Sequence, residues 1–229
     1  MNKAKIFIAC DTANPRKLNQ VIKQSRTDKL KISYKIGLEF FLSPKGRNFI
    51  SNLQKEEILL DLKLNDIPNT CASAVYSLRD LKNISYLTVH TQGGLEMLKM
   101  ARKTAKKINK KLKILGVTVL TSFSNSSIKK IGHTKSIKEL VKKQASLAKL
   151  AKLDGIVCSG HEASLIKKIC KRMEIITPGI RLAGDEAGDQ KRVVTPREAF
   201  KNGATAIVMG RSITKGDIKN NIQKLIKSL

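Results

Sequence analysis

Hydrophobic and polar positions divide the chain into two kinds of segment. Short runs rich in Ile, Val and Leu alternate with longer stretches in which apolar residues recur every three or four positions. A short apolar run predicts a buried strand, and the longer spacing predicts an amphipathic helix. The pattern therefore predicts repeated strand–helix units on a parallel sheet. Eight short runs occur, at residues 5–11, 33–39, 57–64, 86–92, 113–122, 155–159, 174–180 and 206–211.

Helix-like segments lie between these runs. The clearest cover residues 15–25, 70–81, 95–107, 138–151, 162–170, 195–202 and 217–228. Eight strand–helix units predict an α/β fold, a single (β/α)8 TIM barrel domain over residues 1–229, rather than an open sheet. No GxGxxG or GxxxxGK[ST] follows the first strand, which argues against a dinucleotide or P-loop site.

The ends of the predicted strands carry side chains and turns suited to binding or reaction. In a barrel of this kind the C-terminal strand ends form the active-site face. We therefore expect the active site among these residues. They are Asp11, Lys35, Asp61, Lys63, His90, Thr121, Ser122, Gly210 and Arg211.

The stretch DLKLNDIPNT, residues 61–70, is the most informative of these ends. Asp61 and Lys63 are two positions apart on a strand, so both side chains point to one side while the intervening leucines point to the other. Charges in a barrel mouth need partners, which Lys35 and Asp66 could provide. A structural salt bridge is the alternative. Four alternating charges exceed what packing requires, however, and would keep a lysine protonated for use as an acid.

The formal net charge of +27 raises nucleic-acid binding as a second hypothesis. The basic residues are mostly Lys on helical stretches, with little Arg or aromatic interleaving for base contacts. A solvated Lys-rich surface explains this pattern better, so we expect no specific nucleic-acid partner. The charge could still attract an anionic substrate, an effect that salt would weaken.

Other compositional features exclude further classes. No stretch approaches the roughly 18 apolar residues of a membrane span, and the opening MNKAKIFIACD is too short an apolar run for a signal peptide, so we expect a soluble cytoplasmic protein. The cysteines lack CxxC spacing and the histidines are far apart, so reduced thiols and no metal site are expected. These residues are Cys10, Cys71, Cys158, Cys170, His90, His133 and His161.

Several blocks of the chain resemble the orotidine 5'-phosphate decarboxylase family, in its bacterial form. They occur in family order across nearly the whole chain, and include LDLKLNDIPNT at 60–70, LTVHTQGG at 87–94, TPGIR at 177–181, AGDQKRVVTPREA at 187–199 and VMGRSIT at 208–214. The resemblance implies a carboxy-lyase that converts orotidine 5'-phosphate to uridine 5'-phosphate and CO2, the last step of de novo pyrimidine synthesis. It also implies that no metal or organic cofactor is needed.

The same resemblance assigns catalytic roles to the charged residues. Lys63 would stabilise the carbanion at C6 of the pyrimidine and then protonate it. Asp61 would lie beside the departing carboxylate, and Lys35 and Asp11 would bind ribose hydroxyls and order the charges. Asp66, with Ile67 and Thr70, would reach into the neighbouring subunit's site, so that the active unit is a homodimer.

Substrate-binding residues follow from the resemblance as well. Thr121 and Ser122 would bind the pyrimidine edge, and Pro178 would pack on the base. The polar, glycine-containing composition of residues 181–190 suits a mobile lid that closes on the phosphate, and an ordinary solvated loop is the alternative. The phosphate-binding residues would be Arg181, Gln190, Gly210 and Arg211.

Two questions stay open at this level. A sister barrel enzyme acting on sugar phosphates, such as a 3-keto-gulonate-phosphate decarboxylase or hexulose-phosphate synthase, would use Mg2+, although Lys35, the pair 121–122 and Gln190 favour the nucleotide. His90 is either a substrate contact or a hydrogen-bonding neighbour of the site.

Three positions depart from the family pattern, with consequences for packing and for lid stiffness: Leu182, Gln92 and Gly160.

Overall fold

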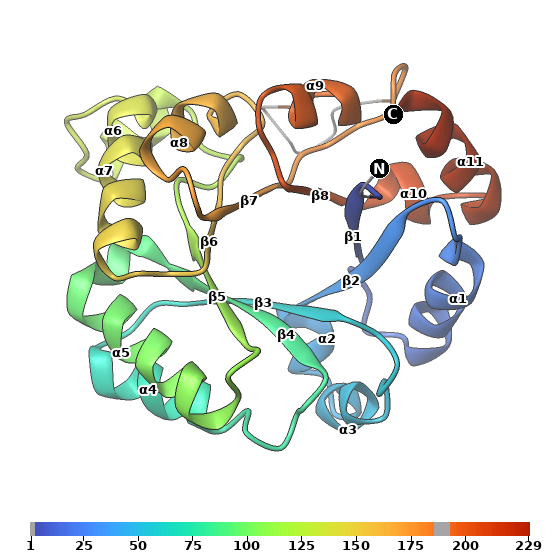
Figure 1. Cartoon of the computed structure of the whole chain (residues 1–229), viewed down its shortest axis with the longest axis horizontal. Helices are drawn as coiled ribbons and strands as arrows, with labels where there is room; N and C mark the ends of the chain where they lie inside the picture. Colours follow the sequence, from blue (N-terminus) through green and yellow to red (C-terminus); the bar gives the residue numbers. More distant parts are fainter. Residues whose placement is uncertain (1–2, 186–192) are drawn as a thin grey trace.

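The structure is a computed structural model that describes residues 3–185 and 193–229. Across these residues eight parallel strands, each paired with its neighbours in chain order, close into a barrel (Figure 1). β8 pairs back onto β1, with Phe7 opposite Val208. The predicted (β/α)8 barrel is therefore confirmed. The strands are β1 Lys5–Ala9, β2 Lys31–Gly37, β3 Ile58–Leu64, β4 Ile84–His90, β5 Lys113–Val117, β6 Gly155–Val157, β7 Glu174–Thr177 and β8 Ala206–Met209.

Helices surround the barrel (Figure 1). All seven predicted helical segments are confirmed, and six of them agree with the prediction to within one residue at each end. The segment predicted over 70–81 forms α4, which begins earlier, at Pro68, and ends at Tyr76. α2, α3, α6 and α10 were not predicted, because a helix of one or two turns is too short to show a 3.6-residue period. The helices are α1 Pro15–Ser25, α2 Leu38–Phe41, α3 Gly46–Ser51, α4 Pro68–Tyr76, the 3-10 helix η1 Thr91–Gly93, α5 Gly94–Ile108, α6 Asn125–Lys130, α7 Ile137–Leu150, α8 Ala163–Ile169, α9 Pro196–Lys201, α10 Arg211–Thr214 and α11 Ile218–Ser228.

Polar residues set several helix starts. The side chain of Asn14 accepts hydrogen bonds from the first turn of α1. Reciprocal capping boxes begin α7, between Ser136 and Glu139, and α9, between Thr195 and Glu198. Each cap satisfies amide groups that the helix itself leaves unpaired and contributes about 1 kcal/mol. The local sequence thus fixes where these three helices begin.

The apolar core has two parts. Leucine and isoleucine side chains on the outer faces of the strands pack against the helices, as Leu60 does. A smaller cluster fills the barrel interior, where the rings of Phe7 and Tyr86 meet edge to face with centroids 5.3 Å apart. Leu59 and Ile176 belong to this inner cluster. The packed interior thus forms the base on which the C-terminal strand ends and their loops stand.

A polar network closes the N-terminal end of the barrel, which we call the floor. The Tyr86 hydroxyl accepts a hydrogen bond from Lys5 Nζ at 2.6 Å and donates one to Glu174 Oε2 at 3.0 Å. Lys5 also pairs with Glu57 at 3.0 Å, and Lys113 forms an ion pair with Glu174. The floor is thus sealed by charged side chains that are paired with one another.

Candidate active site

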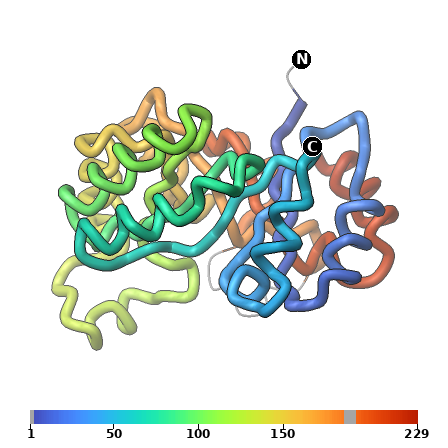
Figure 2. The backbone as a smooth tube through the Cα atoms, turned by 90° about the horizontal axis from the view of Figure 1, so that it is seen from below, coloured from blue at the N-terminus to red at the C-terminus, as the bar shows by residue number. Residues whose placement is uncertain are grey.

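The C-terminal ends of the strands surround a cavity of about 580 Å³. In Figure 2 this end of the barrel faces away from the N-terminus, and the segment between β5 and α7, which contains α6, extends beyond it. Most residues proposed from the sequence line the cavity. These are Asp11, Lys35, Asp61, Lys63, Thr121, Ser122, Pro178, Arg181, Gly210 and Arg211.

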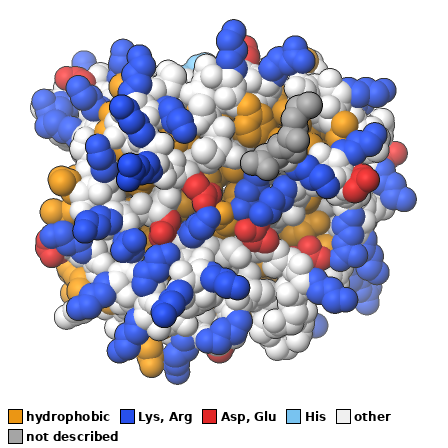
Figure 3. Space-filling model, viewed as in Figure 1, with side chains coloured by type: hydrophobic (Ala, Val, Ile, Leu, Met, Phe, Trp, Pro, Cys, Tyr) orange, Lys and Arg blue, Asp and Glu red, His pale blue; other side chains and the backbone are white. Residues whose placement is uncertain are grey.

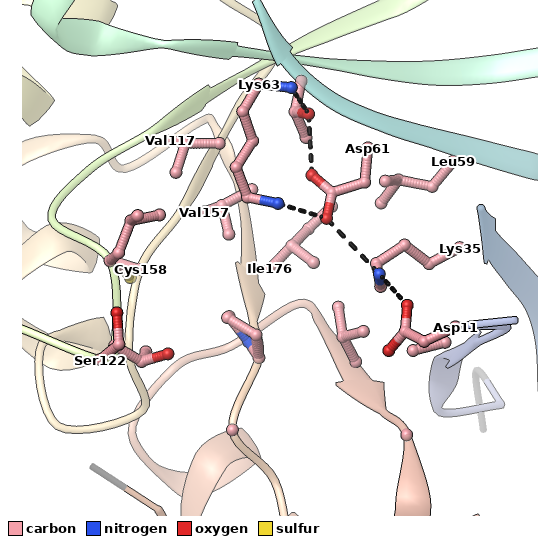
Figure 4. A pocket seen from close by; sticks show the side chains of 18 of the residues that line it. Asp11, Lys35, Leu59, Asp61, Lys63, Val117, Ser122, Val157, Cys158 and Ile176 are labelled. Carbon is pink, nitrogen blue, oxygen red and sulfur yellow. Dashed lines mark hydrogen bonds and ion pairs between the residues drawn. The ribbon is translucent and has the colours of Figure 1, made fainter. Parts of the chain in front are cut away.

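Four charged side chains form a continuous array along one wall of the cavity (Figure 4). Lys35 Nζ lies 2.9 Å from Asp11 Oδ1 and 3.5 Å from Asp61 Oδ2. Lys63 Nζ donates to the same Asp61 oxygen at 2.7 Å. The array therefore alternates in sign from β1 across β2 to β3, and Asp61 is shared by both ammonium groups.

The two innermost members of the array are held in their charged forms. Burial acts to raise the pKa of Asp61, but the charges of Lys35 and Lys63 outweigh burial and hold that pKa below its usual value. Burial likewise acts to lower the pKa of Lys35, and the carboxylates of Asp61 and Asp11 reverse the effect and raise it. The wall thus carries fixed charges near neutral pH.

The backbone of β3 is irregular where the array ends. Leu62 and Leu64 pack outward against the core while Asp61 and Lys63 line the cavity, as the alternation predicts. The pairing with β4, however, steps from Leu60–Leu87 to Leu64–Val89, which marks a bulge. Lys63 itself has φ 48°, in the left-handed region. This conformation costs on the order of 1–3 kcal/mol for a residue with a side chain and is typical of functional sites.

Thr88 on β4 connects the two ends of this irregular stretch, and sequence reasoning did not single it out. Its hydroxyl accepts the backbone N–H of Lys63 at 2.9 Å and donates to Asp61 Oδ1 at 2.8 Å. Thr88 is 1% exposed. The available signal was its position two residues before His90, but a threonine within a strand is ordinarily a packing residue.

The opposite side of the cavity is less charged and more varied. Ser122 and Cys158 lie across from the charged array, and Val157 and Ile176 lie between them and it (Figure 4). Such a pocket, with an apolar base and a few polar groups, suits a flat ring that needs orientation at its edges.

Two guanidinium groups mark the rim near β7 and β8. Arg181 and Arg211 line both the main cavity and an adjoining one of about 350 Å³, which Lys215 also lines. Burial and the neighbouring charge of Arg211 lower the pKa of Arg181. Asp185 lines the smaller cavity as well, and the three cations outnumber it, so the rim keeps a net positive charge that fits an anion. Gln190, and residues 186–190 of the predicted lid, lie outside the described residues.

Three residues of DLKLNDIPNT lie apart from their own chain's cavity. Asp66, Ile67 and Thr70 are exposed, and none lines the cavity. Asp66 Oδ1 accepts the backbone N–H of Ile67 at 2.7 Å. Within one chain Asp61 is therefore paired with Lys35 and Lys63 and not supplemented by Asp66, because the chain turns outward into α4 straight after β3. The contribution of Asp66 to a neighbouring subunit's site stays a prediction.

His90 lies beside the site rather than on its surface. It precedes η1, and its Nδ1 accepts the backbone N–H of Gln92 at 3.3 Å. Burial and the nearby charge of Lys63 lower its pKa. His90 does not line the cavity.

The departures from the family pattern have structural explanations. Leu182 is 8% exposed and joins the apolar core. A Cβ atom at Gly160 would come within 2.3 Å of Val194 Cγ2. Val194 bridges to Ile180, so the absent side chain at position 160 lets the two ends of the segment after β7 meet. Gln92 is exposed.

Residues 3–185 and 193–229 lack two kinds of feature. These ranges hold no group of three or more His, Cys, Asp or Glu side chains placed to bind a metal ion. They also hold no helix long and apolar enough to span a membrane.

The parallel barrel, with a charged cavity at the C-terminal ends of its strands, defines an enzyme of the (β/α)8 class. The chain belongs to the Orotidine 5'-phosphate decarboxylase / HUMPS family, whose model matches residues 4–224. The resemblance noted from the sequence is thereby confirmed.

Individual relatives cover almost the whole chain. It is 43% identical over 229 residues to an orotidine 5'-phosphate decarboxylase of Wolbachia sp. subsp. Brugia malayi, with 98% of both chains covered. It is 40% identical over 231 residues to one of Fusobacterium nucleatum, covering 99% of this chain and 96% of the relative. The crystal structure of orotidine 5'-phosphate decarboxylase from Lactobacillus acidophilus superposes with a TM-score of 0.84 at 31% identity, with 99% of each chain covered.

Proposed function

We propose that this protein converts orotidine 5'-phosphate to uridine 5'-phosphate and CO2 in pyrimidine biosynthesis. The observation that carries the proposal is the array of Asp11, Lys35, Asp61 and Lys63 along the cavity wall. Near-full-length relatives with this activity in their names support it. The buried free cysteines suit a reducing compartment such as the cytoplasm, where we place the enzyme.

The proposed reaction needs no redox step. The bond between C6 and the carboxylate breaks, CO2 leaves, and the electron pair stays on C6. The Lys63 ammonium stabilises that pair and then gives C6 a proton. Asp61 lies beside the substrate carboxylate, so the like-charge contact is relieved as neutral CO2 departs.

The size of the barrier explains why several groups are needed. The most effective enzymes accelerate their reactions about 10^17-fold, or roughly 23 kcal/mol, whereas a single acid or base contributes about 10^2- to 10^4-fold. Proton donation by Lys63 therefore supplies only part of the effect. The rest comes from fixed charges that need no rearrangement during reaction and from binding energy gained at the phosphate.

Substrate placement follows from the cavity's two ends. The phosphate binds at Arg181, Arg211 and the backbone at Gly210, with Gln190 as a further ligand. The ribose hydroxyls reach Lys35 and Asp11. Thr121 and Ser122 bind the pyrimidine edge, and Pro178 packs on the base. This orientation places C6 beside Lys63.

We further propose that the active unit is a homodimer. Asp66, Ile67 and Thr70 would then contribute to the partner's cavity. The support is that exposed apolar residues follow two adjacent strands: Ile67 after β3 is 67% exposed, and Leu38 and Leu42 after β2 are 49% and 73% exposed. Exposed apolar side chains that gather in one region suit a protein interface. A dilution series by analytical ultracentrifugation that shows only monomer in active enzyme would exclude the arrangement.

The direct test follows the absorbance of orotidine 5'-phosphate with purified protein. We expect turnover that persists in excess EDTA. Turnover that requires added Mg2+, or acts only on a sugar phosphate, would support the sister-enzyme alternative instead. Tight duplex binding without decarboxylation would support the nucleic-acid alternative. Basic side chains spread over the face in Figure 3 rather than forming one stripe, which argues against that outcome.

A further inference from the structure

The Thr88 hydroxyl occupies a position where a single group meets two parts of the charged array. It takes one hydrogen bond from the Lys63 backbone and gives its only proton to Asp61 Oδ1. A hydroxyl has a single O–H donor. Because Thr88 Oγ1 acts as the acceptor towards the Lys63 N–H, its O–H remains free to donate to the Asp61 carboxylate. Both contacts are short, and Thr88 is buried.

The contact decides how the Asp61 carboxylate is rotated. Oδ1 is taken by Thr88, and Oδ2 therefore faces Lys63 at 2.7 Å and Lys35 at 3.5 Å. The lysines bind the same oxygen, so they do not fix the rotation of the carboxylate by themselves. Thr88, from the neighbouring strand, supplies the third point that does.

The same hydroxyl also supports the backbone at Lys63. The left-handed φ of 48° and the bulge turn the Lys63 N–H away from regular pairing with β4. Thr88 Oγ1 replaces the missing carbonyl acceptor. A half-buried amide that lost this acceptor would favour a return to regular strand geometry, which would move the base of the Lys63 side chain.

We propose that Thr88 is a positioning residue of the active site, which orients the Asp61 carboxylate and holds Lys63 in its left-handed conformation. The inference rests on the proposed function for its kinetic consequences. Its structural consequence, the state of Asp61, can be measured without turnover.

The test compares Thr88→Val, which keeps the shape but lacks the hydroxyl, with Thr88→Ser, which restores it. For Thr88→Val we expect kcat to fall about 10- to 100-fold, because the variant loses a preorganised contact to residues that in turn contact the substrate. KM should change little. Thr88→Ser should recover most of the rate. The control is Thr91→Val, which removes another buried threonine hydroxyl, bonded to the Val117 carbonyl at 2.7 Å.

A second readout is the titration of Asp61. The charged groups that face it are Lys63 on its own strand and Lys35 on β2, with Asp11 beyond Lys35 and His90 on β4 near Lys63. A donated hydrogen bond favours the carboxylate, so its loss raises the Asp61 pKa. The acid limb of kcat/KM should move to higher pH in Thr88→Val, and carbon NMR of the labelled carboxyl should show the same change.

The outcomes separate the two claims. Unchanged kcat and an unchanged Asp61 titration in Thr88→Val would overturn the inference, as would equal losses in Thr88→Ser or in Thr91→Val. An unmodified protein without activity towards orotidine 5'-phosphate would overturn the proposed function instead. In that case the carboxyl titration still decides the role of Thr88.

Discussion

The barrel has a lysine–carboxylate cluster at each end, and the two clusters differ in how they are closed. At the floor, Lys5 contacts Glu57 and the Tyr86 hydroxyl and also lies 4.4 Å from the centre of the Tyr86 ring. At the mouth, one oxygen of Asp61 serves two lysines beside an open cavity. The same residue types thus make a sealed network at one end and an accessible charged surface at the other.

The two clusters also differ in the direction in which the pKa of their buried lysine is shifted. Burial lowers the pKa of Lys5 even though Glu57 and Glu174 are close. At the mouth, the carboxylates around Lys35 outweigh burial and raise its pKa. At the floor the two partners differ, because burial disfavours the Lys5 ammonium whereas the Ser33 hydroxyl and Lys5 outweigh burial and lower the pKa of Glu57. At the mouth, both Lys35 and Asp61 are shifted towards their charged forms. This difference predicts that floor changes affect folding and mouth changes affect chemistry.

The largest expected effect is that of Lys63→Ala. Removing the proton donor and its charge should lower kcat by at least about 10^4-fold, while uridine 5'-phosphate still binds, because the phosphate-binding groups are untouched. Stopped-flow or long-incubation assays with calorimetric binding would measure both quantities. Lys113→Ala at the floor is the matched control and should keep its turnover. Full activity in Lys63→Ala would refute the assigned role.

Arg211→Ala should have the next largest effect. The loss of a charge-assisted contact to phosphate is worth about 1.5–3 kcal/mol, so kcat/KM should fall roughly 10- to 100-fold, mainly through KM. Steady-state kinetics would separate the two parameters. Arg47→Ala, which removes a surface guanidinium paired with Asp80, is the control. An unchanged kcat/KM would count against a phosphate site at this rim.

The substitution Lys5→Met disrupts the polar network of the floor, because it leaves Glu57 without its ammonium partner. The side chains of Lys5 and Glu57 are 14% and 28% exposed, so we expect a loss of about 1–3 kcal/mol and a fall in Tm of roughly 2–12 °C. Lys99→Met, in an exposed pair with Glu96, should change Tm little. Assays below the Tm should find kcat/KM unchanged, and a large kinetic loss would end the division between the two barrel ends.

The sequence predicted the mouth better than the floor, for identifiable reasons. Asp61 and Lys63 stand out because charges interrupt an apolar run at a strand end, where function is expected. Lys5 and Glu174 begin strands, where polar residues are ordinary. The left-handed backbone at Lys63 and the hydrogen bonds from Thr88 to Lys63 and Asp61 depend on how β3 pairs with β4. The hydrophobic pattern of a single strand contains no information on that pairing.

The smallest expected effect concerns the surface charge, which influences how fast an anionic substrate reaches the cavity at the mouth. A formal net charge of +27 attracts an anionic substrate over a distance that shrinks as the Debye length falls from about 30 Å at 0.01 M salt to about 8 Å at 0.15 M. Between these conditions kcat/KM should fall by less than about tenfold, while kcat stays constant, because the bound array is shielded from salt. Orotidine, which lacks the phosphate and keeps only the charge of its carboxylate, is the control and should show a weaker dependence. If kcat fell as well, salt would be reaching the Asp61–Lys63 pair itself, and the mouth would be more open than its geometry indicates.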